Sequence, residues 1–394
     1  MRRLSADFIF TGKNILRKGI IEVDKNGTII SVTDTKGKLD EQQSLEFYNG
    51  ILVPGFINTH CHLELSHMKG MIKNDTGRGL PGFIDEIISK RNFPENLQEK
   101  INKADKEMQM KGIVAAGDIS NTDDSFIVKK KSKIYYQTFV ESFTVSNEKA
   151  EENFKQAEDN YRKLKNMHLP ASIVPHAAYS VPDKLYRMIS DFESGKKRII
   201  SVHNQETSDE DLLIQSKKGA LANVLADKGF FLDDFSYPGS TALEVNLHYL
   251  NKNDNILLIH NTFSKEKDIK TAENFSENIF WVFCPLSNLY IEKKLPNIPL
   301  FFKKSVKTCI GTDSYASNTE LSVLSELKAI TENFPEISFE KLIESATLNG
   351  AKALQIDRRY GSIEKGKTPG INLITSFDSI KMTLKPESKI KVLV

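Results

Sequence analysis

The sequence has few cysteines and no long apolar run. Its three cysteines, Cys61, Cys284 and Cys309, are far apart and odd in number, which argues against a disulfide framework. No run of about 18 apolar residues occurs, so no segment is long enough to cross a bilayer. The N-terminal stretch MRRLSADFIF is interrupted by Asp7 and is too short for a secretory signal. We therefore expect a cytoplasmic protein without a membrane segment.

The chain also lacks an excess of charge of either sign. Its 54 basic and 52 acidic residues give a formal net charge of +2. This balance offers no electrostatic reason to expect nucleic acid or an anionic membrane as a partner. The 394 residues are 39% hydrophobic and 27% charged, as in ordinary globular proteins. This length accommodates a barrel of about 250 residues with a smaller companion domain.

Both ends of the chain have the composition of short strands. DFIFTG, GIIEVDKNGTIISVTD and LEFYNGILVPG near the N-terminus are rich in Ile, Val and Phe and are separated by turn signals. The C-terminal stretch from residue 370 to 394 has the same character. We expect residues 1–53 and 355–394 to form one small β-sandwich domain.

Between these ends, short apolar runs alternate with amphipathic stretches. The runs are LVPGFINTHCH, GIVAAGDIS, KIYYQTFVES, ASIVPHAAYS, RIISVHNQE, NILLIHNTF, IFWVFCPLSN and KTCIGTDS. Their composition is typical of parallel strands buried on both faces, and the intervening segments have helical spacing. Eight such units predict an α/β fold, a (β/α)₈ TIM barrel, over residues 54–354.

Polar residues that can bind metal finish several of these runs. The chain has only eight histidines, and five of them follow apolar runs: His60 and His62 after the first, His176 after the fourth, His203 after the fifth and His260 after the sixth. Asp313 follows the eighth run. In a TIM barrel these strand ends meet at one face, where active sites lie.

His60 and His62 are two residues apart, so on a strand their side chains share one face. Together with His203 and Asp313 they make a plausible shell for one divalent metal ion. Zn²⁺ is expected, with Fe²⁺ as the alternative. A His-x-His pair alone is a weak signal that arises by chance. The matching positions of His203 and Asp313 favour the metal site.

Glu206 follows His203 by three residues, which puts both side chains on one face if the chain turns helical there. A carboxylate beside a metal site is suited to proton transfer. The alternative is a solvated glutamate in the first turn of a helix. His67 lies beyond the first strand and is expected to be a loop or packing residue. Cys61 should face away from its neighbouring histidines as a buried thiol.

The motifs PGFINTHCHLE, HNQE, LLIHNTF, CPLSN and GTDSYASN occur in this order. The chain resembles the amidohydrolase superfamily, in its cytosine deaminase-like branch. The resemblance implies that His60, His62, His203 and Asp313 bind one metal ion and that Glu206 and His260 handle protons, with Asp313 taking part in catalysis. It also implies that His176 and Ser317 contact the substrate. Binuclear relatives have a bridging lysine after strand four, and its absence here implies a mononuclear site.

The resemblance implies hydrolytic deamination of an amino-substituted heteroaromatic ring. The expected substrate is a small molecule, an adenine nucleoside derivative such as adenosine, S-adenosylhomocysteine, methylthioadenosine or aminodeoxyfutalosine. Hydrolysis of a cyclic amide or a ring C–Cl bond is the alternative, followed by a non-catalytic binding homologue. Nucleoside deaminases of this branch hold the ribose with an acidic residue and an aromatic one after strand one. Here Pro81, Gly82 and Phe83 stand near that place, so the pair is missing, and Asp85, Glu86 or Arg91 is the alternative source of ribose recognition. The oligomeric state is left open, with a homodimer as one option.

Overall fold

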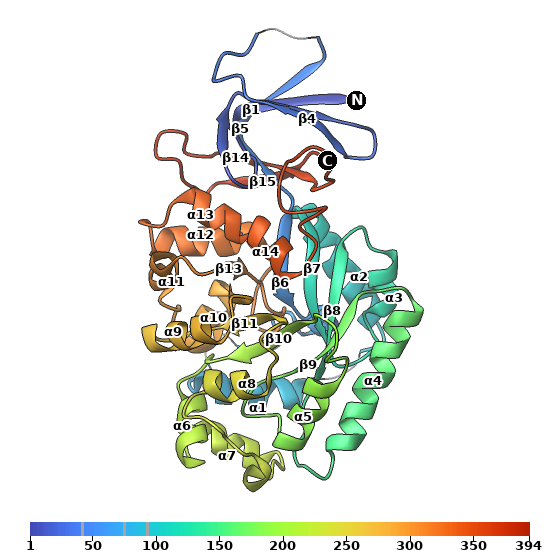
Figure 1. Cartoon of the computed structure of the whole chain (residues 1–394), viewed down its shortest axis with the longest axis vertical. Helices are drawn as coiled ribbons and strands as arrows, with labels where there is room; N and C mark the ends of the chain where they lie inside the picture. Colours follow the sequence, from blue (N-terminus) through green and yellow to red (C-terminus); the bar gives the residue numbers. More distant parts are fainter. Residues whose placement is uncertain (41–42, 74–75, 92–93) are drawn as a thin grey trace.

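A computed structural model describes residues 1–40, 43–73, 76–91 and 94–394. Strands from both chain ends lie together at one end of the molecule, and the alternating strands and helices of the central segment form the rest (Figure 1). Among the residues described, no helix combines the length and apolarity needed to span a membrane.

The terminal strands form one mixed sheet of seven strands, in the order β15-β14-β5-β1-β3-β4 with β2 paired to β1. β1 and β5 are parallel, and the other pairs are antiparallel. All seven strands belong to this single hydrogen-bonded sheet, which draws strands from both ends of the chain. The strands are β1 (Arg2–Phe10), β2 (Ile15–Arg17), β3 (Ile20–Val23), β4 (Ile29–Thr33), β5 (Leu45–Pro54), β14 (Ile371–Thr375) and β15 (Lys389–Val392).

Eight further strands lie where the apolar runs predict them. They are β6 (Phe56–Cys61), β7 (Ile113–Ser120), β8 (Tyr135–Ser142), β9 (Ala171–Pro175), β10 (Ile199–Asn204), β11 (Asn255–His260), β12 (Ile279–Phe283) and β13 (Thr308–Ile310). Most of their residues are buried on both faces; all six residues of β11 and all five of β12 are. This double burial explains why the runs are apolar without alternation.

The eight strands form two parallel sheets of four, β6-β7-β8-β9 and β10-β11-β12-β13. Isolated parallel bridges join the sheets at both seams, one between Ala177 and His203 and one between Cys61 and Asp313. The second seam also has hydrogen bonds from the backbone amides of Thr312 and Asp313 to the carbonyl oxygen of His60, both at 3.0 Å. The second seam therefore brings β6 and β13, the first and last strands of the set, together.

Helices follow the strands and cover their outer side (Figure 1). α4 illustrates the pattern, because Ala157, Tyr161 and Leu164 are buried at helical spacing while its other face is charged. The helices are α1 (Gly79–Lys90), α2 (Leu97–Met110), α3 (Phe126–Lys131), α4 (Ala150–Asn166), α5 (Asp183–Asp191), α6 (Asp209–Ser216), α7 (Ala220–Asp227), α8 (Ala242–Tyr249), α9 (Glu266–Phe275), α10 (Pro285–Glu292), α11 (Ile298–Lys304), α12 (Val323–Asn333), α13 (Phe339–Ser345) and α14 (Leu348–Ala353), with 3₁₀ helices η1 (Leu63–Met68) and η2 (Leu232–Asp234).

The seam between β13 and β6 depends on a glycine. A Cβ atom at Gly311 would lie 2.8 Å from the Cβ of His60 and 2.9 Å from the sulfur of Cys284. Both atoms are close to the backbone and cannot rotate away. The absence of a side chain at Gly311 therefore lets the two strands approach closely, just before Asp313.

Candidate active site

Strand ends hold the predicted metal-binding residues at one face. His60 is the penultimate residue of β6, and His62 follows that strand. His203 is the penultimate residue of β10, and His260 is the last residue of β11. Asp313 follows β13. His260 and Asp313 adopt left-handed backbone conformations, with φ of 73° and 56°. Such conformations cost about 1–3 kcal/mol and gather at functional sites.

Three imidazoles converge at this face. Ligand atoms of His60, His62 and His203 all lie within 4.8 Å of one another. The Nε2 atoms of His60 and His62 are 3.2 Å apart, and Oδ1 of Asp313 is 3.6 Å from the first and 3.4 Å from the second. A tetrahedral zinc site with bonds of about 2.05 Å has edges of about 3.3 Å. The spacing of these donors therefore fits one such ion.

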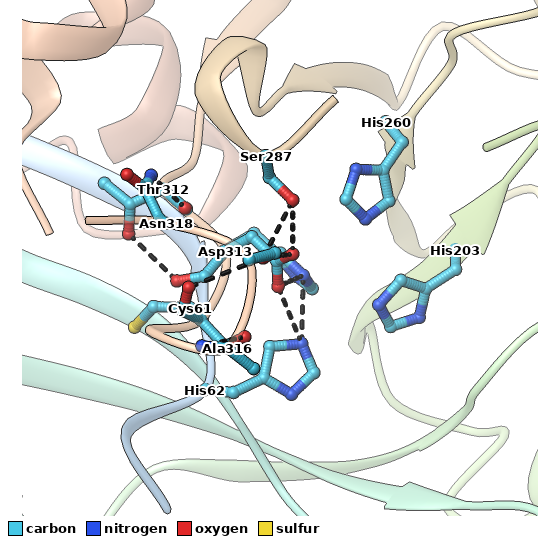
Figure 2. Close-up of polar contacts among 12 residues, drawn as sticks. Cys61, His62, His203, His260, Ser287, Thr312, Asp313, Ala316 and Asn318 are labelled. Atoms are coloured by element: carbon cyan, nitrogen blue, oxygen red, sulfur yellow. Dashed lines mark hydrogen bonds and ion pairs between the residues drawn. The ribbon is translucent and has the colours of Figure 1, made fainter. Parts of the chain in front are cut away.

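The protonation of the site also fits a cation. Burial and the neighbouring imidazoles lower the pKa of His62 far below its usual value. The same causes lower the pKa of His203 to about 3. Both rings are therefore neutral near pH 7 and have a lone pair to offer, as metal binding requires. Figure 2 shows the rings of His62, His203 and His260 facing a common space beside Asp313.

Asp313 is fixed by two hydroxyl groups. The Oγ atoms of Ser287 and Ser317 lie 2.6 and 2.5 Å from its Oδ2, which leaves Oδ1 toward the imidazoles. Burial raises the pKa of Asp313, but the adjacent His60, His62 and His260 outweigh it, and the net pKa is well below the usual value. Asp313 is thus an oriented carboxylate.

Glu206 and His260 form the second part of the site. Oε1 of Glu206 is 3.6 Å from Nε2 of His260, and both side chains are almost completely buried. Burial, together with the nearby Asp313 and Glu210, raises the pKa of Glu206 well above its usual value, which favours its protonated form. Burial lowers the pKa of His260, which favours its neutral form. The two groups lie side by side.

A contact on the other side of the ring favours one tautomer of His260. Nδ2 of Asn288 lies 3.3 Å from Nδ1 of His260. An amide nitrogen only donates hydrogen bonds, so Nδ1 accepts and the proton of the neutral ring resides on Nε2. His260 therefore presents an N–H toward Glu206 and the common space.

The site opens into a cavity of about 190 Å³. His62, His203, Glu206, His260 and Asp313 line its inner end. Apolar side chains line much of the remaining wall: Leu65, Leu80, Phe83, Ile84, Ile87, Ile88, Leu225 and Phe230. The cavity therefore joins a polar, titratable end to an apolar one.

The other predicted residues take different places. His176 lines the cavity, with its ring 4.7 Å from that of His203, but Ser317 is behind Asp313 and is not among the lining residues. The expected substrate contact of Ser317 stays a prediction, and Ser314 is among the lining residues. Cys61 is a buried free thiol 3.3 Å from Asp118, on the opposite face as predicted. His67 is buried within η1, which agrees with a packing residue.

Helix α1 contains the segment where the resemblance implies a ribose-holding pair. Phe83 and Arg91 line the cavity, but Asp85 pairs with Arg78 and Lys228, and Glu86 pairs with Lys90. Around this helix the cavity wall therefore has an aromatic and a basic side chain and no acidic one.

Several residues of the site were not predicted as functional. Ser287 and Asn288 belong to the CPLSN motif, which by itself gives neither residue a role. Glu210 lies one helical turn beyond Glu206, a spacing that signals proximity but not function. Glu141 is the penultimate residue of β8, and its place at the end of an apolar run is the same signal that identified the histidines.

Known proteins resemble the chain along most of its length. The model of the amidohydrolase family matches residues 51–392. An adenosine deaminase of Helicobacter pylori is 27% identical over 83% of this chain and 79% of its own length. A 5′-deoxyadenosine deaminase of Methanococcus vannielii is 27% identical over 94% and 85%.

Solved structures share the fold. The aminofutalosine deaminase of Helicobacter pylori, in complex with methylthio-coformycin, superposes with a TM-score of 0.80 at 23% identity, covering 96% of this chain and 93% of that one. The zinc-complexed atrazine chlorohydrolase of Arthrobacter aurescens has a TM-score of 0.74 at 14% identity, covering 100% and 94%.

Proposed function

This chain belongs to the amidohydrolase family, and from that premise we propose that it deaminates an adenine nucleoside derivative by hydrolysis. Membership makes it a metal-dependent hydrolase that acts on C–N bonds. Two relatives named as adenosine and 5′-deoxyadenosine deaminases support an adenine-containing substrate. Adenosine, 5′-deoxyadenosine, methylthioadenosine, S-adenosylhomocysteine and aminodeoxyfutalosine are the candidates.

The observation that carries the proposal is the convergence of His60, His62, His203 and Asp313 from three separate strand ends. In our proposal these four residues hold one divalent cation, with Zn²⁺ preferred over Fe²⁺. The zinc named with the chlorohydrolase structure agrees with that choice. When bound, the cation is a Lewis acid that lowers the pKa of water toward about 7, so that hydroxide is available at neutral pH.

Residues of the chain manage the protons. Asp313 accepts a proton from the attacking water, whose oxygen forms a bond to the ring carbon bearing the amine. Glu206 donates its proton to the adjacent ring nitrogen, and the N–H of His260 stabilises the oxygen that gains negative charge. The proton held by Asp313 then passes to the amine, and the C–N bond breaks to release ammonia. Glu206 recovers a proton from the new hydroxyl group as the ring carbonyl forms.

The cavity supports a nucleoside with an apolar 5′ group. The reacting ring occupies the inner end beside Glu206 and His260, and His176 lies along its path. The apolar wall beyond them suits a methylthio, deoxy or aromatic substituent better than a phosphate. Since no basic cluster is among the lining residues, a nucleotide is disfavoured.

We also propose that the eight central strands act as one closed (β/α)₈ barrel, domain 54–354. The single bridges at both seams support closure. In our proposal, residues 1–53 and 355–394 form the companion β domain, and their mixed sheet is part of the predicted sandwich.

A deaminase screen tests the proposal. The metal-loaded protein is incubated with the five candidate nucleosides, and with cytosine and guanine, while ammonia release is recorded and metal content is measured on the same sample. Ammonia from at least one adenine nucleoside, with one metal ion per chain, is the expected result. Turnover of only a cyclic amide or a chlorinated ring, or protein that binds no metal, would contradict it.

A further inference from the structure

Glu141 is a buried carboxylate on the cavity wall that the proposed chemistry does not use. It lies near the end of β8, lines the cavity, and its side chain is 3% exposed. Its Oε2 accepts a hydrogen bond from Nδ2 of Asn121 at 3.0 Å. Its Oε1 has no hydrogen-bond partner among the residues that the structure describes. A buried carboxylate oxygen without a donor is costly, so a donor from outside the chain is expected there.

A second metal ion is one candidate for that place, because ligand atoms of Glu141, His176 and His203 lie within 4.8 Å of one another. The hydrogen bonds argue against it. Nδ1 of His203 is 3.0 Å from the carbonyl oxygen of His176. A carbonyl only accepts, so this nitrogen carries a proton and has no lone pair for a cation. Nδ1 of His176 is also engaged, 2.6 Å from Oγ of Ser180. Too few free donors remain for a metal.

The same contacts place Glu141 relative to the reaction. Its Oε1 is 3.5 Å from Nδ1 of His203, which is the ring nitrogen turned away from the cation site. Glu141 is thus separated from the cation site by the imidazole ring of His203. Glu141, Glu206 and His260 line one cavity, so a substrate whose amine-bearing carbon lies beside Glu206 and His260 shares that cavity with Glu141.

The chemistry of an adenine nucleoside limits which of its groups can donate to Glu141. The N–H and O–H donors that all five candidates share are the exocyclic amine and the sugar hydroxyls, and S-adenosylhomocysteine adds an ammonium group at its far end. The amine is bound at the reacting end, so the hydroxyls remain. We propose that Glu141 is a specificity-determining residue whose carboxylate accepts hydrogen bonds from the ribose hydroxyl groups. This inference rests on the proposed function and specifies its substrate class as ribonucleosides.

Phe143 supports this placement. It is two residues after Glu141, lines the same cavity, and is 39% exposed despite its size. Its ring centroid is 5.5 Å from that of His176. The end of β8 thus offers a hydrogen-bond acceptor and an apolar ring side by side, as the polar edge and apolar face of a sugar require.

The test compares the wild-type chain with Glu141→Gln and Glu141→Met. The control is Glu193→Gln, which makes the same chemical change at a carboxylate that accepts a hydrogen bond from Tyr161 and does not line the cavity. Each protein is assayed with adenosine, 2′-deoxyadenosine and 3′-deoxyadenosine. We expect wild type to lose about 10- to 100-fold in kcat/KM when a hydroxyl that Glu141 holds is removed. Glu141→Met should lose a similar factor on adenosine, mainly through KM, and should barely distinguish the three nucleosides.

Metal content, melting temperature and calorimetric binding are measured on the same samples. An equal loss on all three nucleosides would overturn the proposal and leave Glu141 a positioning residue for His203. A metal content that drops by one ion in both variants would also overturn it, in favour of a second cation. If wild type releases no ammonia, the proposed function fails. The role of Glu141 is then tested by calorimetric binding: it holds if wild type binds adenosine more tightly than its deoxy forms and the Glu141 variants do not.

Discussion

The side chain of Glu210 accepts the backbone N–H of Glu206 at 2.6 Å. The same carboxylate also accepts the N–H groups of Gln205 and Thr207, at 3.2 and 3.3 Å. Gln205 has a left-handed φ of 48°, so these bonds hold a turn that the backbone would otherwise avoid. A carboxylate four residues later in the chain therefore determines where Glu206 points.

Replacing Glu210 with Ala should leave the three N–H groups of this turn without a partner. We expect a loss of about 1–3 kcal/mol in unfolding free energy for each N–H left without a partner, and reduced kcat because Glu206 loses its position. Glu210→Gln is the control, since its amide oxygen still accepts. Urea unfolding and steady-state kinetics measure both effects. Wild-type kcat in Glu210→Ala would show that the turn does not need this support.

The protonation of Glu210 predicts a pH-dependent stability. Burial, opposed by the backbone hydrogen bonds, raises its pKa from 4.5 to about 8. A raised pKa means that the folded state binds the proton more tightly than the unfolded state, so this stabilisation is complete below about pH 4.5 and is lost as the pH rises through about 8. Wild type should therefore lose stability relative to Glu210→Gln across that range, by up to about 1.4 kcal/mol per pH unit. An equal difference in unfolding free energy between wild type and Glu210→Gln at pH 5 and pH 9 would contradict this prediction.

Replacing Glu206 with Gln removes the proton donor but keeps its size. We expect turnover to fall by about 10²- to 10⁴-fold while metal content is unchanged. Because burial raises the pKa of Glu206, wild-type kcat should decline on the alkaline side as this proton is lost, and the variant should lack that limb. A pH profile of kcat with elemental analysis measures both. Loss of metal in the variant, or full activity, would contradict the role of Glu206.

A methyl group at position 311 should disturb the metal site without touching a ligand. In Gly311→Ala the new Cβ would lie 2.8 Å from the Cβ of His60, so β6 and β13 have to move apart. We expect a loss of about 1–3 kcal/mol in stability and weaker metal binding. Gly195→Ala is the matched control, because no atom lies within 4 Å of its added Cβ. Equal metal affinity in the two variants would refute this account.

The ion pair between Asp118 and Lys129 gives a fifth prediction. Both side chains are fully buried, with Nζ and Oδ2 2.5 Å apart, and Oδ1 of Asp118 accepts the backbone N–H of Leu63. Lys129→Met leaves a buried carboxylate uncompensated and should cost about 3–5 kcal/mol. Adding Asp118→Asn should recover part of that loss, which thermal unfolding of the single and double variants measures. A single variant as stable as wild type would show that the pair is dispensable.

Local sequence predicted where the central strands lie and which residues come together at their ends, whereas the binding of a metal ion by those residues stays a prediction. His60, His62, His203 and Asp313 each follow an apolar run, and the parallel arrangement of those runs is enough to bring their ends together. The position of Ser317 behind Asp313 was not predictable in this way. It depends on the backbone after Asp313, where a positive φ reverses the direction that simple alternation would give.

Glu141 and Glu210 were missed for a different reason. The sequence shows that Glu141 and Glu210 are each close to the end of a strand. It does not show whether either carboxylate accepts hydrogen bonds. The three amides around Glu210 and the lone Asn121 donor at Glu141 come from a turn and from a neighbouring strand end, and only the folded chain shows them.

The mixed sheet has a consequence for how the protein is made. β5 is followed directly by β6, which contains His60. In the mixed sheet, Pro54 of β5 is paired with Ile371 of β14, which comes much later in the chain. On the ribosome, the first histidines emerge long before β14 and β15 exist to cover the strand that leads to them. The nascent polypeptide therefore exposes an uncovered apolar edge until β14 and β15 have been synthesised, and deletion of these two strands should produce aggregation rather than a smaller working enzyme.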